Sequence, residues 1–206
     1  MDKDIVKEFW RKRALTGHTR WTGDGMLAFD QALLRPLVGD DTRILDLGSG
    51  FGELSRSICG PGDSLVAVDQ EPGMAAGFEG DDRFAFVHSS VVDYVPEGRF
   101  DLVLLFGVIT HLTEEEEEAV YSVIVSALAT AGVAVIKNQC SDGADLTVDT
   151  YSEALGASYV GRYPSVESQR SRLARRFGSV EIVEYPPELK MHRNSSHVAF
   201  VCREPR

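Results

Sequence analysis

The chain has 206 residues, of which 43% are hydrophobic, and its formal net charge is −11. This length suits one domain built around a sheet that is covered on both faces. Nucleic-acid binding depends on clustered Lys and Arg that neutralise phosphates, so an acidic chain is a poor candidate for it. The chain has no 18-residue apolar run and no apolar leader at its start. We therefore expect a soluble, cytoplasmic protein without nucleic-acid or membrane partners, and the sequence leaves its oligomeric state open.

Taken in chain order, the hydrophobic pattern predicts two helices followed by alternating strands and helices. The helices are expected at 3–15 and 24–37, with a loop between them. Strands are expected at 43–47, 64–68, 84–87, 100–106 and 132–137, and a final pair at 180–185 and 197–202.

The best-defined helix begins after Thr113, which can form a capping box with Glu116. The acidic run from Glu114 to Glu118 is therefore predicted to be a helix start, and the helix should end at Gly132. A cluster of arginines is predicted to lie on a later helix and to mark a solvated face; it comprises Arg162, Arg170, Arg172, Arg175 and Arg176.

Three alternating glycines, Gly48, Gly50 and Gly52, follow the first predicted strand. Glycine lets a strand turn tightly into a helix and leaves bare backbone beside a ligand. The second predicted strand ends in Asp69, where a carboxylate can accept hydrogen bonds from ribose hydroxyls. Together these features indicate a nucleoside-cofactor site. Because Glu53 stands where a dinucleotide fingerprint has its third glycine, NAD is the weaker alternative.

The pattern Asp46-x-Gly48-x-Gly50-x-Gly52 with Asp69 resembles the first motif of class I S-adenosylmethionine (SAM) methyltransferases. The resemblance covers roughly residues 42–137, with a weaker match to the end. It implies an α/β, Rossmann-like fold: a seven-stranded, mostly parallel sheet with helices on both faces, an antiparallel last strand and N-terminal helices before it. It also implies one SAM-binding domain over 1–206, with a helical lid at 1–40, a cofactor core at 42–137 and a substrate-side insertion at 138–165.

The same resemblance assigns cofactor contacts beyond the first motif. Ser90 and the amide of Val91 correspond to the adenine-contacting turn after the third strand. Phe106 and Gly107 correspond to the segment beside the methionine part of SAM. The full expected cofactor set is Asp46, Gly48, Ser49, Gly50, Gly52, Asp69, Gln70, Ser90, Val91, Phe106 and Gly107.

The absence of several family motifs narrows the classes of molecule that could accept the methyl group. The segment after the fourth strand lacks Asn/Asp-Pro-Pro-Tyr, and no Pro-Cys pair is present, which disfavours amide, exocyclic amine and cytosine C5 methylation. Lys137-Asn138 stands where metal-dependent catechol enzymes have Asp-Asn, so no metal is expected. The cofactor core leaves little chain for a recognition domain, and a small-molecule acceptor is therefore expected.

Residues 1–40 and 138–165 hold the side chains predicted to act on that acceptor. Tyr, Arg and Asn together can orient an anionic or amino-acid-like ligand and exclude water. The candidate catalytic residues are His18, His111, Asn138, Tyr159 and Tyr163. The candidate substrate-binding residues are Arg20, Trp21, Gln139, Tyr151 and Arg162.

Three functions fit the sequence. The first is methyl transfer to an O, N or C nucleophile of a small molecule, expected in secondary metabolism. The second is a SAM-consuming cyclase similar to azetidine-2-carboxylate synthases, which would release methylthioadenosine and for which Asn138 could hold a folded methionine moiety. The third is a non-catalytic SAM-binding protein.

Overall fold

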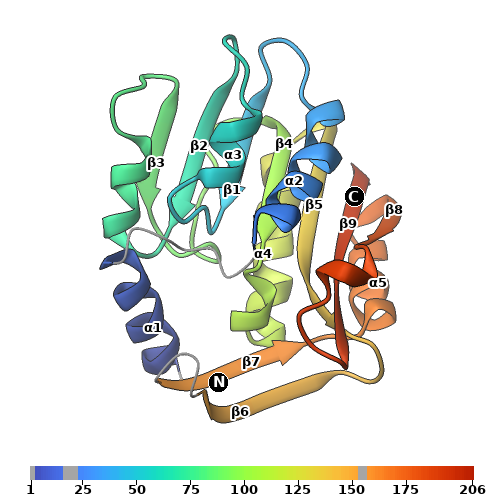
Figure 1. Ribbon diagram of the computed structural model, residues 1–206. Coiled ribbons are helices and arrows are strands. Elements are labelled where there is room, and N and C mark those ends of the chain that lie inside the picture. The colour runs from blue at the N-terminus through green and yellow to red at the C-terminus, as the bar shows by residue number, and fades with distance from the viewer. Residues whose placement is uncertain (1–2, 16–22, 153–156) are drawn as a thin grey trace.

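The computed structural model describes residues 3–15, 23–152 and 157–206. Seven strands form the main sheet in the order β3-β2-β1-β4-β5-β9-β8 (Figure 1). The first five of these pair in parallel, and β9 is antiparallel to both of its neighbours. The strand bounds are β1 Arg43–Leu47, β2 Ser64–Asp69, β3 Phe84–His88, β4 Phe100–Phe106, β5 Leu128–Ser141, β8 Phe177–Glu184 and β9 Ser195–Pro205. This arrangement confirms the predicted fold class.

Helices cover both faces of the sheet because successive strand residues point to opposite sides. Leu45 and Leu47 face a core cluster with α4 (Glu114–Ala127) and α5 (Val166–Ala174). Ile44 faces the other cluster, with α2 (Asp24–Leu34) and α3 (Glu53–Ile58). Short 3-10 turns complete the layers: η1 Arg35–Leu37, η2 Pro72–Phe78, η3 Ile109–His111 and η4 Pro187–Leu189. Within the described ranges, no helix is long and apolar enough to span a bilayer.

Two further elements lie along the carboxyl edge of the parallel strands. The helix α1 (Lys3–Leu15) and the hairpin formed by β6 (Leu146–Ser152) and β7 (Ala157–Tyr163) sit together at this edge in Figure 1. The strand β7 packs on η3 and on α1, and α1 also reaches η2. Ligands of open α/β sheets bind outside the carboxyl ends of the strands, so these elements cover the edge where a site is expected.

Two predicted boundaries were wrong. The helix α4 ends at Ala127, and β5 begins at Leu128, not near 132. Gly132 lies within β5, where an added Cβ would be 2.9 Å from the carbonyl oxygen of Phe100. Gly132 therefore allows close approach of β4 and β5 and does not mark a helix end. The insertion after residue 138 also contains a β-hairpin that the pattern did not predict.

Candidate functional site

The predicted glycine turn has a backbone that other residues adopt only with strain. Gly48, Gly50 and Gly52 have φ angles of +76°, +54° and +70°. A Cβ on Gly48 would lie 2.4 Å from Cγ2 of Val108, and one on Gly52 would lie 2.4 Å from Cε1 of Phe78. The turn therefore requires glycine for its conformation and for its packing.

The carboxylate of Asp69 joins the tip of β2 to this turn. Its Oδ2 accepts a hydrogen bond of 2.9 Å from the amide of Gly50, and its Oδ1 accepts one of 2.9 Å from the amide of Glu71. Burial raises the pKa of Asp69, while the amides of Glu71 and Gly50 oppose that rise. Because each carboxylate oxygen can accept more than one hydrogen bond, Asp69 can bind hydroxyl donors while it holds the turn.

Asp46 lies beneath the turn and is 6% exposed. Burial is the main cause that raises the pKa of Asp46 to about 7; the nearby hydroxyl of Ser55 opposes the rise, and the negative charge of Asp69 adds to it. The structure therefore gives this predicted cofactor residue a supporting position, from which its charge acts on Asp69 and on the turn.

The segment after β4 provides the opposite wall. The amide of Gly107 donates a 2.8 Å hydrogen bond to the carbonyl of Lys137, which fixes this turn to β5. Gly107 has a φ of +72°, and a Cβ added there would meet no atom of the described residues within 4 Å. The backbone at Gly107 thus borders open space at the carboxyl edge, as a ligand-facing turn requires.

The remaining predicted cofactor residues lie at the same edge. Ser90 begins the turn after β3, where its Oγ accepts a 3.4 Å hydrogen bond from the amide of Val92, and Val91 is 8% exposed. The hydroxyl of Ser49 donates to the carbonyl of Gly50, and the carbonyl of Gln70 lies 3.0 Å from Nε2 of His88. The structure therefore brings the whole predicted cofactor set to the tips of β1 to β4.

The predicted acceptor residues divide into several groups. His111 lies in η3, and its ring packs edge-to-face on Trp10 of α1 with centroids 5.4 Å apart. The amide of Gln139 donates to the hydroxyl of Ser195 at 2.7 Å. Tyr163 is 9% exposed, whereas Tyr151 on β6 is 63% exposed. His18, Arg20 and Trp21 lie outside the described residues, as does the side chain of Tyr159.

Two of these predictions need correction because the side chains are core contacts. Asn138 is 1% exposed and donates a 2.6 Å hydrogen bond to Gln169 on α5. Arg162 is 8% exposed, lies on β7 and not on a helix, and forms an ion pair with Glu117. These contacts favour structural roles for both residues.

Glu117 is the centre of this buried network. Its carboxylate also accepts hydrogen bonds from the hydroxyl of Tyr121 at 2.6 Å and from Nη1 of Arg172 at 2.7 Å. The predicted start of α4 and its capping box are confirmed. The prediction of a solvated arginine face is wrong for Arg162 and Arg172, whose side chains are 10% and 13% exposed.

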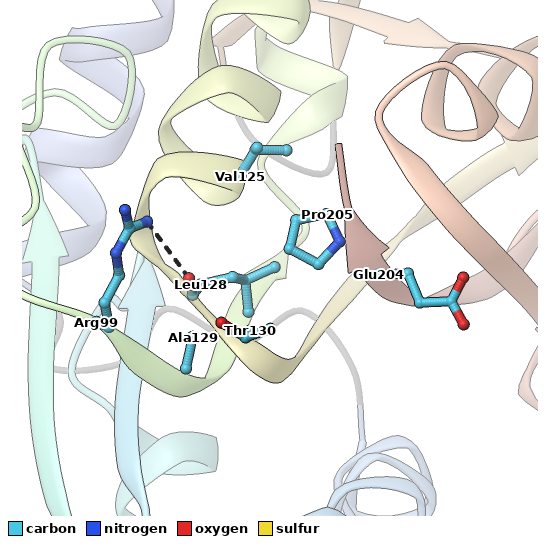
Figure 2. Close-up of a pocket in the computed structure, with 7 residues that line it drawn as sticks. All are labelled: Arg99, Val125, Leu128, Ala129, Thr130, Glu204 and Pro205. Atoms are coloured by element: carbon cyan, nitrogen blue, oxygen red, sulfur yellow. Dashed lines mark hydrogen bonds between the residues drawn. The ribbon is translucent and has the colours of Figure 1, made fainter.

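One cavity, of about 510 Å³, lies away from this site. Figure 2 shows its lining, where Nη1 of Arg99 donates to the carbonyl of Leu128 at 3.4 Å. The other residues that line it come from the end of α4, the start of β5 and the end of β9. This hollow is therefore at the amino edge of the parallel strands, opposite the glycine turn. Within the described ranges, no group of three or more His, Cys, Asp or Glu could hold a metal ion.

Comparison with known proteins agrees with this geometry. Residues 44–132 match the family model of a methyltransferase domain, and this segment contains the glycine turn, Asp69 and Gly107. Over this segment the chain is therefore similar to methyltransferase domains. The match confirms the resemblance predicted from the sequence, and the cofactor of this enzyme class is SAM. No curated protein matches the chain in sequence.

Solved structures share the fold of the methyltransferase domain at low sequence identity. The Burkholderia thailandensis 1,6-didemethyltoxoflavin-N1-methyltransferase, bound to 1,6-didemethyltoxoflavin and S-adenosylhomocysteine, has a TM-score of 0.74 and 21% identity and covers 100% of this chain and 92% of its own. DhpI in complex with S-adenosylhomocysteine (SAH) has a TM-score of 0.71 and 21% identity, with coverage of 100% and 99%. The glycopeptide N-methyltransferase MtfA with SAM has a TM-score of 0.68 and 15% identity, with coverage of 87% and 94%.

Proposed function

We propose that the protein transfers the methyl group of SAM to an O, N or C nucleophile of a small molecule. The observation that carries this proposal is the shared edge of β1, β2 and β4. There the left-handed glycine turn, the carboxylate of Asp69 and the turn at Gly107 lie at the ends of three neighbouring strands. Ligands of open α/β sheets bind at such an edge.

The residues at this edge fit the parts of SAM. Asp69 would accept hydrogen bonds from the ribose hydroxyls, and the amide of Val91 would contact the adenine. The glycine turn and the carbonyl of Gly107 would lie along the methionine part. SAM supplies a methyl group that its sulfonium already activates.

The contribution of the protein is then alignment and exclusion of water. The helix α1 and the strand β7 contact each other and cover the carboxyl edge, where they can close a small space around an acceptor. Holding two reactants in line can supply about 7–11 kcal/mol of the barrier. We therefore expect alignment of the two reactants to supply most of the lowering of the activation barrier for methyl transfer.

His111 is the described histidine that we propose as a base for a hydroxyl or ammonium acceptor. It lies one turn after Gly107, and Trp10 restricts its ring. A positioned base contributes about 10²–10⁴-fold. A neutral amine or a carbanion needs no base, so loss of His111 should lower the rate only for acceptors that must lose a proton.

A small acceptor is favoured because the fold elements leave no separate recognition unit in the described chain. The neighbours support this, since one is described with 1,6-didemethyltoxoflavin and another as a glycopeptide N-methyltransferase. We propose a role in secondary metabolism on the same grounds. The cyclase alternative is less well supported, because the amide nitrogen of Asn138 is buried and donates to Gln169.

Product analysis tests the proposal. Calorimetry with SAH should show binding, and a panel of phenols, amines and keto acids should give SAH from SAM only when an acceptor is present. Methylthioadenosine formed from SAM alone would instead establish cyclisation. Absence of SAH binding, with clean titration by NADH, would refute the cofactor assignment itself.

A further inference from the structure

A second group of buried polar side chains lies between α2 and the sheet, and the reaction described above does not use it. We call Asp30, Lys137, Tyr185 and His197 the α2-side cluster. The ammonium of Lys137 donates to Oδ2 of Asp30 at 3.0 Å, and the hydroxyl of Tyr185 donates to Oδ1 of Asp30 at 2.6 Å. These side chains are at most 9% exposed. Buried ionic groups cost several kcal/mol to desolvate, so such a cluster is a weak source of stability.

The α2-side cluster borders the place where the methyl group would be transferred. Lys137 pairs with Phe106 across β4 and β5, and its carbonyl accepts the amide of Gly107. The ammonium of Lys137 lies 5.7 Å from the ring centre of Phe106 and 5.1 Å from that of Tyr185. Lys137 of the α2-side cluster is therefore directly bonded, through its backbone, to the turn at Gly107 that we expect to contact the cofactor.

His197 lacks a hydrogen-bond partner that its burial requires. The residue is 8% exposed, and its Nδ1 is buried and makes no hydrogen bond within the described part of the chain. A buried polar atom without a partner costs about the full desolvation penalty of the group, and native structures contain few of them. A ligand that bonds to Nδ1 would remove that cost.

The charges around His197 indicate whether such a ligand would carry a negative or a positive charge. Lys137 and His197 are diagonal neighbours on one face of the β5–β9 pair, because Lys137 is opposite Ala199 and Gln139 is opposite His197. Burial is the main cause that lowers the pKa of His197 to about 4, and the positive charges of Lys137 and His192 contribute to that shift. Two cationic groups therefore act on the ring of His197, while Asp30 lies on the α2 side and is bonded to Lys137 and Tyr185.

A groove lies on the surface beside α2, the helix that carries Asp30. It has a volume of about 280 Å³ and lies between the first turn of α2 and η4, where Met26, Leu189 and Lys190 are part of its lining. Met26 belongs to the same apolar cluster as Tyr185. Entry of a ligand from this groove to the α2-side cluster would require displacement of Met26 or of its apolar neighbours.

We propose that the α2-side cluster is a subsite for an oxyanion, carried by the methyl acceptor as a carboxylate or a phosphate-type group. The ring of His197 donates from Nδ1, and the ammonium of Lys137 supplies the positive charge. The use of this subsite for the acceptor rests on the proposed function, but its affinity for an oxyanion does not. The subsite would select anionic acceptors and orient their nucleophile toward Gly107.

Histidine NMR tests the proposal without knowledge of the acceptor. The ring nitrogens of the ¹⁵N-labelled protein are followed while acetate, inorganic phosphate, acetamide or methylammonium is added, and His197→Phe assigns the His197 signals. Acetate or phosphate should shift the His197 signals saturably and raise the pKa of His197, because an anion favours the protonated ring. Comparison of the two oxyanions distinguishes a carboxylate site from a phosphate site. Equal shifts with acetamide or methylammonium would overturn the proposal.

Two variants and a control separate binding from folding. Asp30→Asn combined with Lys137→Met removes both buried charges together, so that neither remains unpaired, and should weaken oxyanion binding at least tenfold. His197→Phe should weaken it similarly, measured by calorimetry with the better oxyanion. Arg203→Met removes an exposed cation from the other end of β9 and should leave binding unchanged. Wild-type oxyanion affinity in both variants would refute the subsite, whereas loss of SAH binding in the wild-type protein would refute only the proposed function.

Discussion

Replacement of Glu117 by Gln should destabilise the protein strongly although the change alters almost no volume. Glu117 is fully buried, and its carboxylate neutralises the guanidinium groups of Arg162 and Arg172. Removing one partner of a buried ion pair costs about 3–5 kcal/mol. Both guanidinium groups also pair with the exposed Glu114, so we expect a loss near the lower end of that range. That loss is a large share of the 5–15 kcal/mol that stabilises an ordinary domain, roughly a third in the middle of the range.

Urea denaturation followed by circular dichroism measures this loss, and Glu118→Gln is the matched control. Glu118 is the next residue of α4, but its side chain is 32% exposed and it pairs with Arg175 and Arg176. An exposed pair contributes about 0–1 kcal/mol, so the control should stay within that range. If Glu117→Gln costs no more than Glu118→Gln, the buried network does not hold β7 and α5 on α4 as the structure indicates.

Three further changes test the cofactor edge. Asp69→Asn should weaken SAH binding, measured by calorimetry, about 10–100-fold, because hydrogen bonds to a charged group contribute about 1.5–3 kcal/mol. An unchanged Kd would exclude Asp69 as a ribose contact. Gly52→Ala should lower the free energy of unfolding, measured with urea, by roughly 2–5 kcal/mol, because Ala is strained in the left-handed region and its Cβ would overlap Phe78. The control Gly80→Ala has a φ of +85° and no described atom near the added Cβ, so it should lower the free energy of unfolding by only about 1–2 kcal/mol. Equal losses in the two variants would contradict the role of packing at Gly52. Burial raises the pKa of Asp46 from 3.8 to about 7, so the folded state binds its proton more tightly and stability falls as pH rises through this window. Asp46→Asn should therefore gain roughly 2 kcal/mol relative to wild type between about pH 5.5 and pH 8, and a pH-independent difference would contradict the assignment.

The cofactor edge could be predicted from the sequence because its requirements are local. Left-handed backbone at Gly48, Gly50 and Gly52 needs glycine, and an acid at the end of the next strand can be recognised from a short segment. The capping box at Thr113 is local in the same sense, and the structure contains both of its hydrogen bonds.

The acceptor side could not be predicted in the same way because its contacts join distant residues. Asp30 and Lys137 are 107 positions apart, and Glu117 and Arg162 are 45 apart. The one available signal was Lys137 itself, a charged residue at the end of an otherwise apolar strand. The strand β7 was missed because Arg162 was assigned to the following helix, where arginine is a common surface residue. No breaker marks the end of α4 before Leu128, so that boundary was placed at the next glycine.

The β6–β7 hairpin is attached to the rest of the protein in a way that bears on how its sequence can vary. The two strands form their own small sheet, separate from the seven-stranded one, and β7 is anchored through the ion pair of Arg162 with Glu117. We expect that another hairpin can replace this one only if it keeps the arginine that pairs with Glu117 and the contacts of Asp142 and Asp145 with the main body of the chain. If the hairpin contacts the acceptor as we propose, a change in its sequence should alter acceptor preference and leave the glycine turn unchanged.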